Sequence, residues 1–234
     1  MGADRRARIL ARLLVPGADV EVRRLCEVGA EVTGMTGAGL MLVSDDGPRG
    51  PVCTTNEVSA LIEALQYELG EGPCVDACTQ DWPVLERDLA NPDTPRWPAF
   101  APPAVAAGVR AIFGFPLQLG AVRLGALNLY RDEPGPLSDD QHADALVMAD
   151  VAAQALLIVQ ADAPPGRVAA ELEAGADFHY VVHQASGMVA AQLEVSVGQA
   201  LVRLRAHAFG HDRPLNAVAQ AVVARELRFD AGNR

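Results

Sequence analysis

The chain contains no lysine, and all 19 of its basic residues are arginine. Aromatic residues make up only 5% of the 234 positions, and histidine occurs five times. No uninterrupted apolar run reaches the roughly 18 residues that a membrane-spanning helix requires, and the N-terminus lacks the small-residue cleavage site of a secretory signal. Because half of the residues are hydrophobic, a substantial core can form. We therefore expect a cytoplasmic protein with no membrane partner.

The net charge of −11 is unevenly distributed along the chain. Residues 1–163 hold 12 Arg and 23 Asp or Glu, whereas residues 164–234 hold seven of each. Residues 183–229 contain five Arg and three Asp or Glu. Only this C-terminal stretch could therefore lie against a polyanion without strong repulsion.

Four cysteines, Cys26, Cys53, Cys74 and Cys78, all lie in the N-terminal part. Without a secretory signal, reduced thiols are expected rather than disulfides. Cys74 and Cys78 share a helical spacing, but no histidine or second close pair completes a zinc set. We expect no bound metal, and structural roles for the thiols are favoured over redox chemistry.

Periodicity and turn residues predict a first domain of mixed helices and strands. Apolar residues at helical spacing predict helices over 3–15, 19–33 and 56–69, and a long helix capped by Ser138 that ends near Ala161. The predicted buried stripe of the third of these helices is Val58, Leu61, Ile62, Leu65 and Leu69. Strands are predicted over 39–43, 51–54, 109–119 and 122–130, with a turn at 45–48. Between Val75 and Pro103 the prolines predict a long irregular stretch, typical of a binding loop or lid.

A series of short motifs then occurs in the order found in a known family. The motifs are Gln66-Tyr-Glu-Leu-Gly-Glu-Gly-Pro-Cys74, Trp82-Pro-Val84, Arg96-Trp-Pro-Ala-Phe100, Gly108-Val-Arg-Ala-Ile112, Phe115-Pro-Leu117, Val122-Arg-Leu-Gly-Ala-Leu-Asn-Leu-Tyr130 and Pro136-Leu-Ser-Asp139. This series resembles GAF sensor domains of actinobacterial regulators. The resemblance implies an antiparallel sheet flanked by helices and a small-molecule pocket on one sheet face, covered by loops.

Aromatic residues and thiols near the loop-rich stretch suit a mostly apolar small-molecule site. The candidate pocket residues are Met41, Cys53, Tyr67, Cys74, Trp82, Trp97, Phe100 and Asn128. Ordinary core packing is the alternative for each of them. The motif of cyclic-nucleotide-binding GAF domains is not visible. Haem would need an axial ligand, and His142, at a helix start where we expect it to be exposed, is the single histidine in this part. No cofactor is therefore expected.

The C-terminal stretch predicts three helices after Pro164-Pro165-Gly166. They run from Arg167 to Leu193, onward from an N-cap at Ser196, and from Pro214 to about Leu227. The stretch is similar to the ANTAR output domain of bacterial antiterminators through Gln184-Ala-Ser-Gly-Met188, Leu193-Glu-Val-Ser196, Ala200-Leu-Val-Arg-Leu-Arg-Ala-His-Ala208, Arg213-Pro-Leu215 and Val218-Ala219. Ser186 departs from the basic residue that many members carry.

The resemblance implies binding to tandem hairpin loops in nascent RNA, which would prevent transcription termination. Arginine and histidine can stack on unpaired bases and contact phosphates. The candidate RNA-binding residues are Gln184, Gly187, Arg203, Arg205, His207 and Arg213. A homodimer is expected because two hairpins suit two modules. The predicted organisation is an N-terminal helical segment (1–19), a GAF-like domain (20–162), a linker (163–166) and an ANTAR-like domain (167–230).

Two other functions stay open at this point. A DNA-binding regulator could use the same three-helix outline, although 215–227 is poor in basic and amide side chains. A redox enzyme, resembling free methionine sulfoxide reductases, would need an activated thiol at Cys53, Cys74 or Cys78, and no basic neighbour in sequence suggests one. No catalytic constellation is otherwise visible, so a non-enzymatic regulator is expected.

Overall fold

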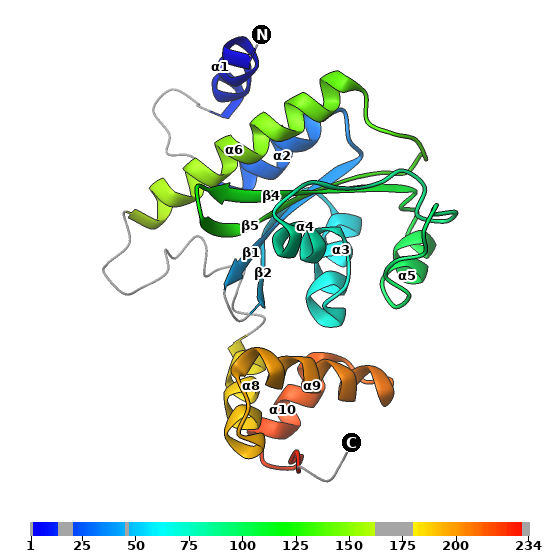
Figure 1. Ribbon diagram of the computed structural model, residues 1–234, viewed down its shortest axis with the longest axis vertical. Helices are drawn as coiled ribbons and strands as arrows, with labels where there is room; N and C mark the ends of the chain where they lie inside the picture. Colours follow the sequence, from blue (N-terminus) through cyan, green and yellow to red (C-terminus); the bar gives the residue numbers. More distant parts are fainter. Residues whose placement is uncertain (1, 14–20, 45–46, 162–179, 231–234) are drawn as a thin grey trace.

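The computed structural model describes residues 2–13, 21–44, 47–161 and 180–230 (Figure 1). The strands are β1 (Gly37–Ser44), β2 (Gly47–Thr54), β3 (Val84–Glu86), β4 (Ala111–Leu119) and β5 (Val122–Arg131). The helices before the end of the sheet are α1 (Gly2–Leu13), α2 (Val22–Thr33), α3 (Glu57–Leu69), α4 (Pro73–Gln80) and α5 (Ala101–Ala106). The helices after it are α6 (Asp139–Ala161), α8 (Tyr180–Leu193), α9 (Val197–Gly210) and α10 (Leu215–Val223).

The five strands form one antiparallel sheet in the order β2-β1-β5-β4-β3. Helices α2 and α6 cover one face, and α3 and α4 lie on the other (Figure 1). The predicted α+β architecture with a flanked antiparallel sheet is therefore confirmed, and the two central strands begin and end within two residues of their predicted limits. Of the predicted turn at 45–48, residues 45–46 lie outside the described residues, whereas Gly47 and Pro48 already belong to β2. The linker 163–166 also lies outside the described residues.

The face under α2 and α6 is filled by apolar side chains from alternate positions of the central strands. Phe113, Phe115 and Leu117 of β4 join Leu127 and Leu129 of β5 in this cluster, as the period-2 pattern of a strand requires. Ser138 caps α6 as predicted, because its Oγ accepts a hydrogen bond from the Gln141 amide at 3.2 Å. This cap fixes the start of α6 at Asp139, and the helix packs along β4.

Helix α6 is long and apolar enough to cross a membrane by length and composition. Its buried face packs against β4 and α2, as expected for the core helix of a folded domain. Its acidic residues bind the arginines of α1: Asp144 accepts from Arg5 at 2.8 Å and from Arg8 at 2.6 Å. These contacts give α6 an ordinary structural role in this domain.

Four expectations require correction. The segment from 75 to 103 is not wholly irregular, because α4, β3 and α5 interrupt it. Of the predicted apolar stripe of α3, Ile62 is buried and Val58, Leu65 and Leu69 pack against the same cluster, but Leu61 is exposed. The helix also buries the polar residues Ser59, Glu63 and Gln66, which were not expected in the core. His142 is half-buried, with its ring against Phe115. Cys26 and Cys53 form a disulfide, because the helix over the sheet brings their Cα atoms to 6.1 Å. Neither the amino-acid composition nor the expected cellular compartment indicates that these two cysteines lie close together in the fold.

Beyond residue 180, helices α8, α9 and α10 pack around a shared apolar core. Ser196 caps α9 in a reciprocal capping box with Gln199. The third helix ends at Val223, four residues before the predicted limit. Of the predicted helix 167–193, the part up to residue 179 lies outside the described residues. Met41 and Tyr67 belong to the same apolar cluster, so these helices contact the sheet domain.

Candidate functional site

A cluster of buried polar side chains lies between α3 and the sheet. Glu63, Gln66 and Asn128 are each at most 2% exposed. The Asn128 amide donates a hydrogen bond to Glu63 Oε1 at 3.1 Å, and Gln66 Oε1 accepts one from the Cys74 backbone at 2.8 Å. Gly39 of β1 makes room for this arrangement, because a Cβ there would lie 2.4 Å from Glu63 Oε1. We call Glu63, Gln66 and Asn128 the polar cluster.

Each member of the polar cluster keeps one buried atom without a hydrogen-bond partner among the described residues: Glu63 Oε2, Gln66 Nε2 and Asn128 Oδ1. Leaving such a group unsatisfied costs about 1–3 kcal/mol, and native interiors rarely leave them so. Burial raises the pKa of Glu63 to about 8, and the Asn128 hydrogen bond lowers it only in part. At neutral pH the carboxyl is mostly protonated, so the cluster offers donors and an acceptor without net charge.

The loops beside the polar cluster are fixed by hydrogen bonds within the recognised motifs. Glu71 accepts from the backbone amides of Ala99 at 3.0 Å and Phe100 at 3.3 Å. The Trp97 indole donates to Asp76 at 2.9 Å. The turn before α4 is thereby connected to the segment before α5.

The predicted pocket residues separate into four groups. Met41, Tyr67, Cys74 and Asn128 are buried on the α3 side of the sheet. Trp97 and Phe100 pack together in an apolar cluster beneath α5. The side chain of Trp82 is exposed. Cys53 lies on the opposite side, bonded to Cys26 of α2. The structure therefore brings together only some of the predicted pocket residues.

The two free cysteines are poor nucleophiles. Burial raises the pKa of Cys74 well above its ordinary value, and the nearby Glu63 raises it further. Burial likewise raises the pKa of Cys78 to about 12. Reactive cysteines are thiolates in accessible, electropositive surroundings. In the described part of the chain, no group of three His, Cys, Asp or Glu side chains is arranged to hold a metal ion.

The predicted RNA-binding residues lie on α8 and α9 and just after them. Gln184, Gly187, Arg203 and Arg213 are exposed. The half-buried His207 stacks on His211 with ring centroids 4.0 Å apart, and its pKa is lowered by burial and by the nearby His211 and Arg213. Ser186 faces the helical core, where its hydroxyl donates to the Val182 carbonyl at 2.8 Å. That position could not contact a phosphate directly.

Arg205 differs from the other candidates because it reaches the sheet domain. Its guanidinium donates two hydrogen bonds to the Tyr67 carbonyl at the end of α3, one of them at 2.9 Å. It also lies over the Tyr67 ring. Gly70, in a left-handed conformation, leaves space for it, since a Cβ there would lie 3.0 Å from Nη1. Burial lowers the pKa of Arg205 to about 10, so it stays charged at neutral pH.

Residues 18–157 match the GAF domain family. The chain belongs to this family. A solved GAF domain from a phosphoenolpyruvate-protein phosphotransferase of Coxiella burnetii is 15% identical, with a TM-score of 0.51 over 68% of this chain and 95% of that one. The GAF domain of the Acinetobacter phosphotransferase is 13% identical, with a TM-score of 0.51 over 69% and 96%. Curated proteins provide no match.

GAF domains are signal-sensing domains, which makes the polar cluster the candidate sensing site of this one. Sequence reasoning missed Glu63 and Gln66 because the apolar residues of α3 suggested a different buried face. The available signal was the spacing Ser59, Glu63, Gln66, which places three polar side chains on one helix face. Opposite a strand that begins Gly37-Ala-Gly39, such a face can be buried.

Proposed function

We propose that this GAF-domain protein is a signal-responsive, non-enzymatic regulator that binds tandem hairpin loops of nascent RNA and prevents transcription termination. The proposal places the protein in the cytoplasm as a homodimer. The observation that carries the signal-responsive part of the proposal is the pair of hydrogen bonds from Arg205 of α9 to Tyr67 of α3. One end of α3 thus contacts the C-terminal helices, and its middle carries the polar cluster.

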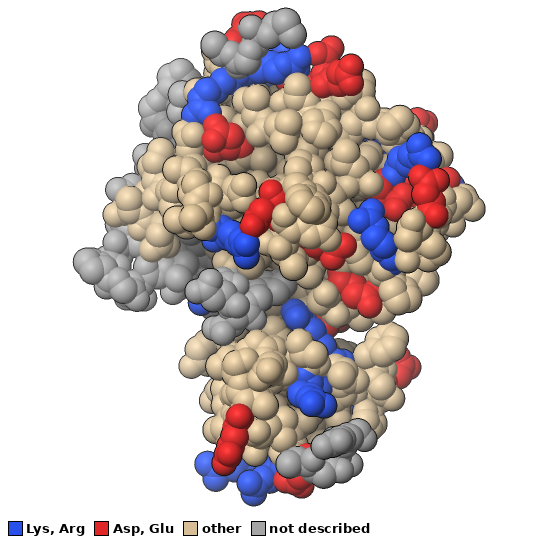
Figure 2. Space-filling model, in the orientation of Figure 1, with Lys and Arg blue, Asp and Glu red and all other residues tan. Residues whose placement is uncertain are grey.

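The exposed side of α8 and α9 provides groups suited to RNA loops. Arg203 forms no ion pair with another described residue, and both Arg203 and Gln184 reach solvent. Helices α8 and α9 contain no acidic residue, and their charged side chains are Arg203 and Arg205. In the face shown in Figure 2, most of the surface of the C-terminal helices is uncharged. Affinity would then depend on contacts with unpaired bases more than on bulk charge.

The polar cluster provides the signal input. A small uncharged ligand with both hydrogen-bond donors and acceptors would satisfy the unpartnered atoms of Glu63, Gln66 and Asn128. Binding would move α3 and thereby the acceptor that Arg205 uses. A ligand that prefers one position of α3 shifts the equilibrium between docked and released helices, and so changes RNA access to α9.

Gel shifts at one fixed salt concentration test the proposal. An RNA with tandem hexaloop hairpins should bind more tightly than the same stems with scrambled loops. Arg203→Ala should weaken binding about 10-fold, the loss of roughly 1.4 kcal/mol for one good base or phosphate contact. The control is Arg228→Ala, which removes another exposed arginine of the same module and should change binding less than 2-fold.

Equal binding of both RNAs would contradict loop recognition. Tighter binding to duplex DNA than to either RNA would instead support a DNA-binding regulator. If both arginine variants lose the same affinity, the interaction is general electrostatic attraction and not a defined contact with α9.

A further inference from the structure

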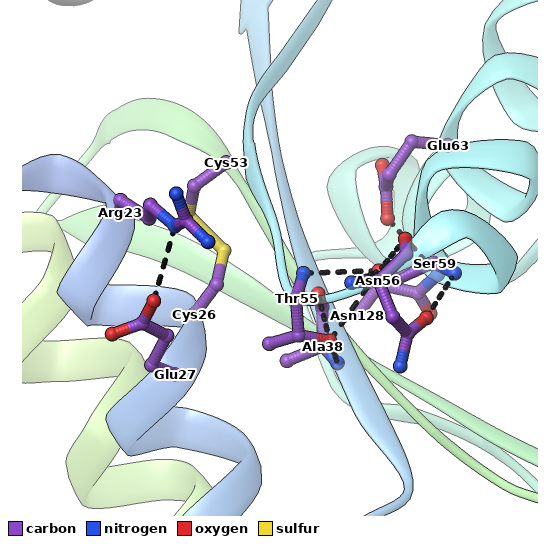
Figure 3. The surroundings of a disulfide bond; sticks show 10 residues. All are labelled: Arg23, Cys26, Glu27, Ala38, Cys53, Thr55, Asn56, Ser59, Glu63 and Asn128. Carbon is purple, nitrogen blue, oxygen red and sulfur yellow. Dashed lines mark hydrogen bonds and ion pairs between the residues drawn. A yellow bond between two sulfur atoms is a disulfide. The ribbon is translucent and has the colours of Figure 1, made fainter.

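The disulfide between Cys26 and Cys53 connects two layers of the GAF domain. Cys26 belongs to α2, which covers one sheet face, and Cys53 belongs to β2, at the edge of the sheet. The two positions are 27 residues apart in the chain. Figure 3 shows Arg23 of the same helix beside this bond. The bond therefore determines whether α2 is covalently held to the sheet edge.

A hollow of about 450 Å³ opens beside the bond. Its lining residues are Arg23, Val52, Cys53, Thr54, Thr55 and Asn56. Cys53 is 7% exposed, whereas Cys26 is fully buried. Because Cys53 lines the hollow and Cys26 does not, a reagent in the hollow would reach Cys53 first, and Cys26 would be the leaving group.

We propose that this hollow is a thiol–disulfide exchange site for a low-molecular-weight anionic thiol. The thiolate of the first molecule attacks Cys53 Sγ, the Cys26–Cys53 bond breaks, and Cys26 leaves as a thiolate that takes a proton. A second thiolate then attacks the sulfur of the bound small molecule. Cys53 is released and protonated, and the two small thiols leave as their disulfide. Two electrons pass from the small thiols to the protein, and the reverse sequence re-forms the bond.

Arg23 gives the site its preference for an anion. Among the described residues that line the hollow, it alone carries a charge. Its Nε donates to Glu27 at 3.1 Å, while most of its side chain remains in solvent. The guanidinium can therefore attract an anionic thiol and favour its thiolate form near Cys53.

The surroundings of Cys53 remain held when the bond opens. The Thr55 amide donates to the Ala38 carbonyl at 3.0 Å, and the Thr55 hydroxyl accepts from the Ala38 amide at 3.0 Å. Asn56 caps α3 and accepts from the Tyr130 hydroxyl at 2.9 Å. Reduction thus removes the covalent link between α2 and β2 without removing the contacts that start α3, which allows the bond to re-form.

Thiol counting and exchange kinetics test the proposal on the full chain. After purification in air, the denatured protein should show two free thiols, and four after full reduction. The folded, oxidised protein should react with mercaptoethanesulfonate, and peptide mapping after an acid quench should find the mixed disulfide on Cys53. Compared at equal thiolate concentration, this anionic thiol should react roughly 3- to 10-fold faster than cationic cysteamine.

Arg23→Gln should remove that preference, while the matched control Arg49→Gln, an exposed arginine of β2 outside the lining of the hollow, should keep it. Far-UV circular dichroism before and after reduction checks that the fold persists. Four free thiols in the air-purified protein, adducts on Cys26, Cys74 or Cys78, or exchange only in denaturant would each overturn the proposal. So would an equal preference in both arginine variants. None of these readouts depends on RNA binding.

Discussion

The two faces of the GAF sheet bury different kinds of side chain. Under α2 and α6, the cluster around Phe115 and Leu127 is apolar, and the Cys26–Cys53 disulfide closes one end. Under α3, the sheet instead meets Glu63 and Gln66. Apolar contacts are complete in themselves and stabilise the fold, whereas the polar cluster leaves hydrogen-bonding capacity unused. The α3 side also buries apolar residues, among them Ile62 and Ile112, so both faces stabilise the fold. The comparison assigns the unused hydrogen-bonding capacity, and with it the proposed signal response, to the α3 side.

Truncation on the apolar face should have the largest effect. Phe115→Ala removes a fully buried ring from the middle of β4 and should lower the free energy of unfolding by about 4 kcal/mol through lost transfer energy and a cavity. Urea unfolding measures this loss. Leu119→Ala, at the partly exposed end of the same strand, should cost less than about 1 kcal/mol. Similar losses in both variants would show that this face is not a tightly packed core.

Replacing the acid of the polar cluster should change the pH dependence of stability. The folded-state pKa of Glu63, about 8, lies above its ordinary value of 4.5 because the side chain is buried. The protonated form stabilises the folded state below pH 4.5, and this contribution is lost as pH rises through 8. Between pH 6 and 7.5, the free energy of unfolding of the wild type should fall by about 2 kcal/mol, whereas that of Glu63→Gln should not show this fall.

Thermal unfolding of both proteins across that pH range measures the difference, with Glu57→Gln as the control. Glu57 lies in the exposed first turn of the same helix. Glu57→Gln should therefore show the same change of stability with pH as the wild type. A Glu63→Gln variant with the wild-type slope would mean that Glu63 is ionised in the folded protein.

The sequence allowed the sheet to be predicted better than the site. Alternating apolar residues and turn glycines located the central strands, and Ser138 located the start of α6. Those signals are local. The disulfide depends on how α2 lies over β2, and the burial of Glu63 depends on the space above Gly39. Both are consequences of tertiary packing: the spacing of Ser59, Glu63 and Gln66 indicates a shared helix face, but not that this face is buried.

The contact at Arg205 was beyond prediction, since Arg205 resembled any other arginine of a helix with an exposed basic side. Its partner is a backbone carbonyl of another domain. A sequence pattern records side chains only, and a backbone acceptor leaves no trace in it. The same arginine was therefore predicted to contact RNA, while the structure places it against Tyr67.

The smallest expected effect is the energetic coupling between the polar cluster and Arg205, and it tests whether the polar face is more than a second core. Glu63→Gln changes a side chain in the middle of α3. Arg205→Ala removes the guanidinium that donates to the carbonyl of Tyr67 in the last turn of the same helix. If α3 transmits a change at the cluster to the docked helices, the two variants should be non-additive by about 0.5–1 kcal/mol in a double-mutant cycle. Native-state hydrogen exchange of the α9 amides supplies the free energies.

The control cycle replaces Arg205→Ala by Arg203→Ala, because Arg203 is exposed on the same helix. That control should be additive within about 0.3 kcal/mol. Additivity in both cycles would leave the polar cluster as a sensing site without a mechanical route to α9 through α3.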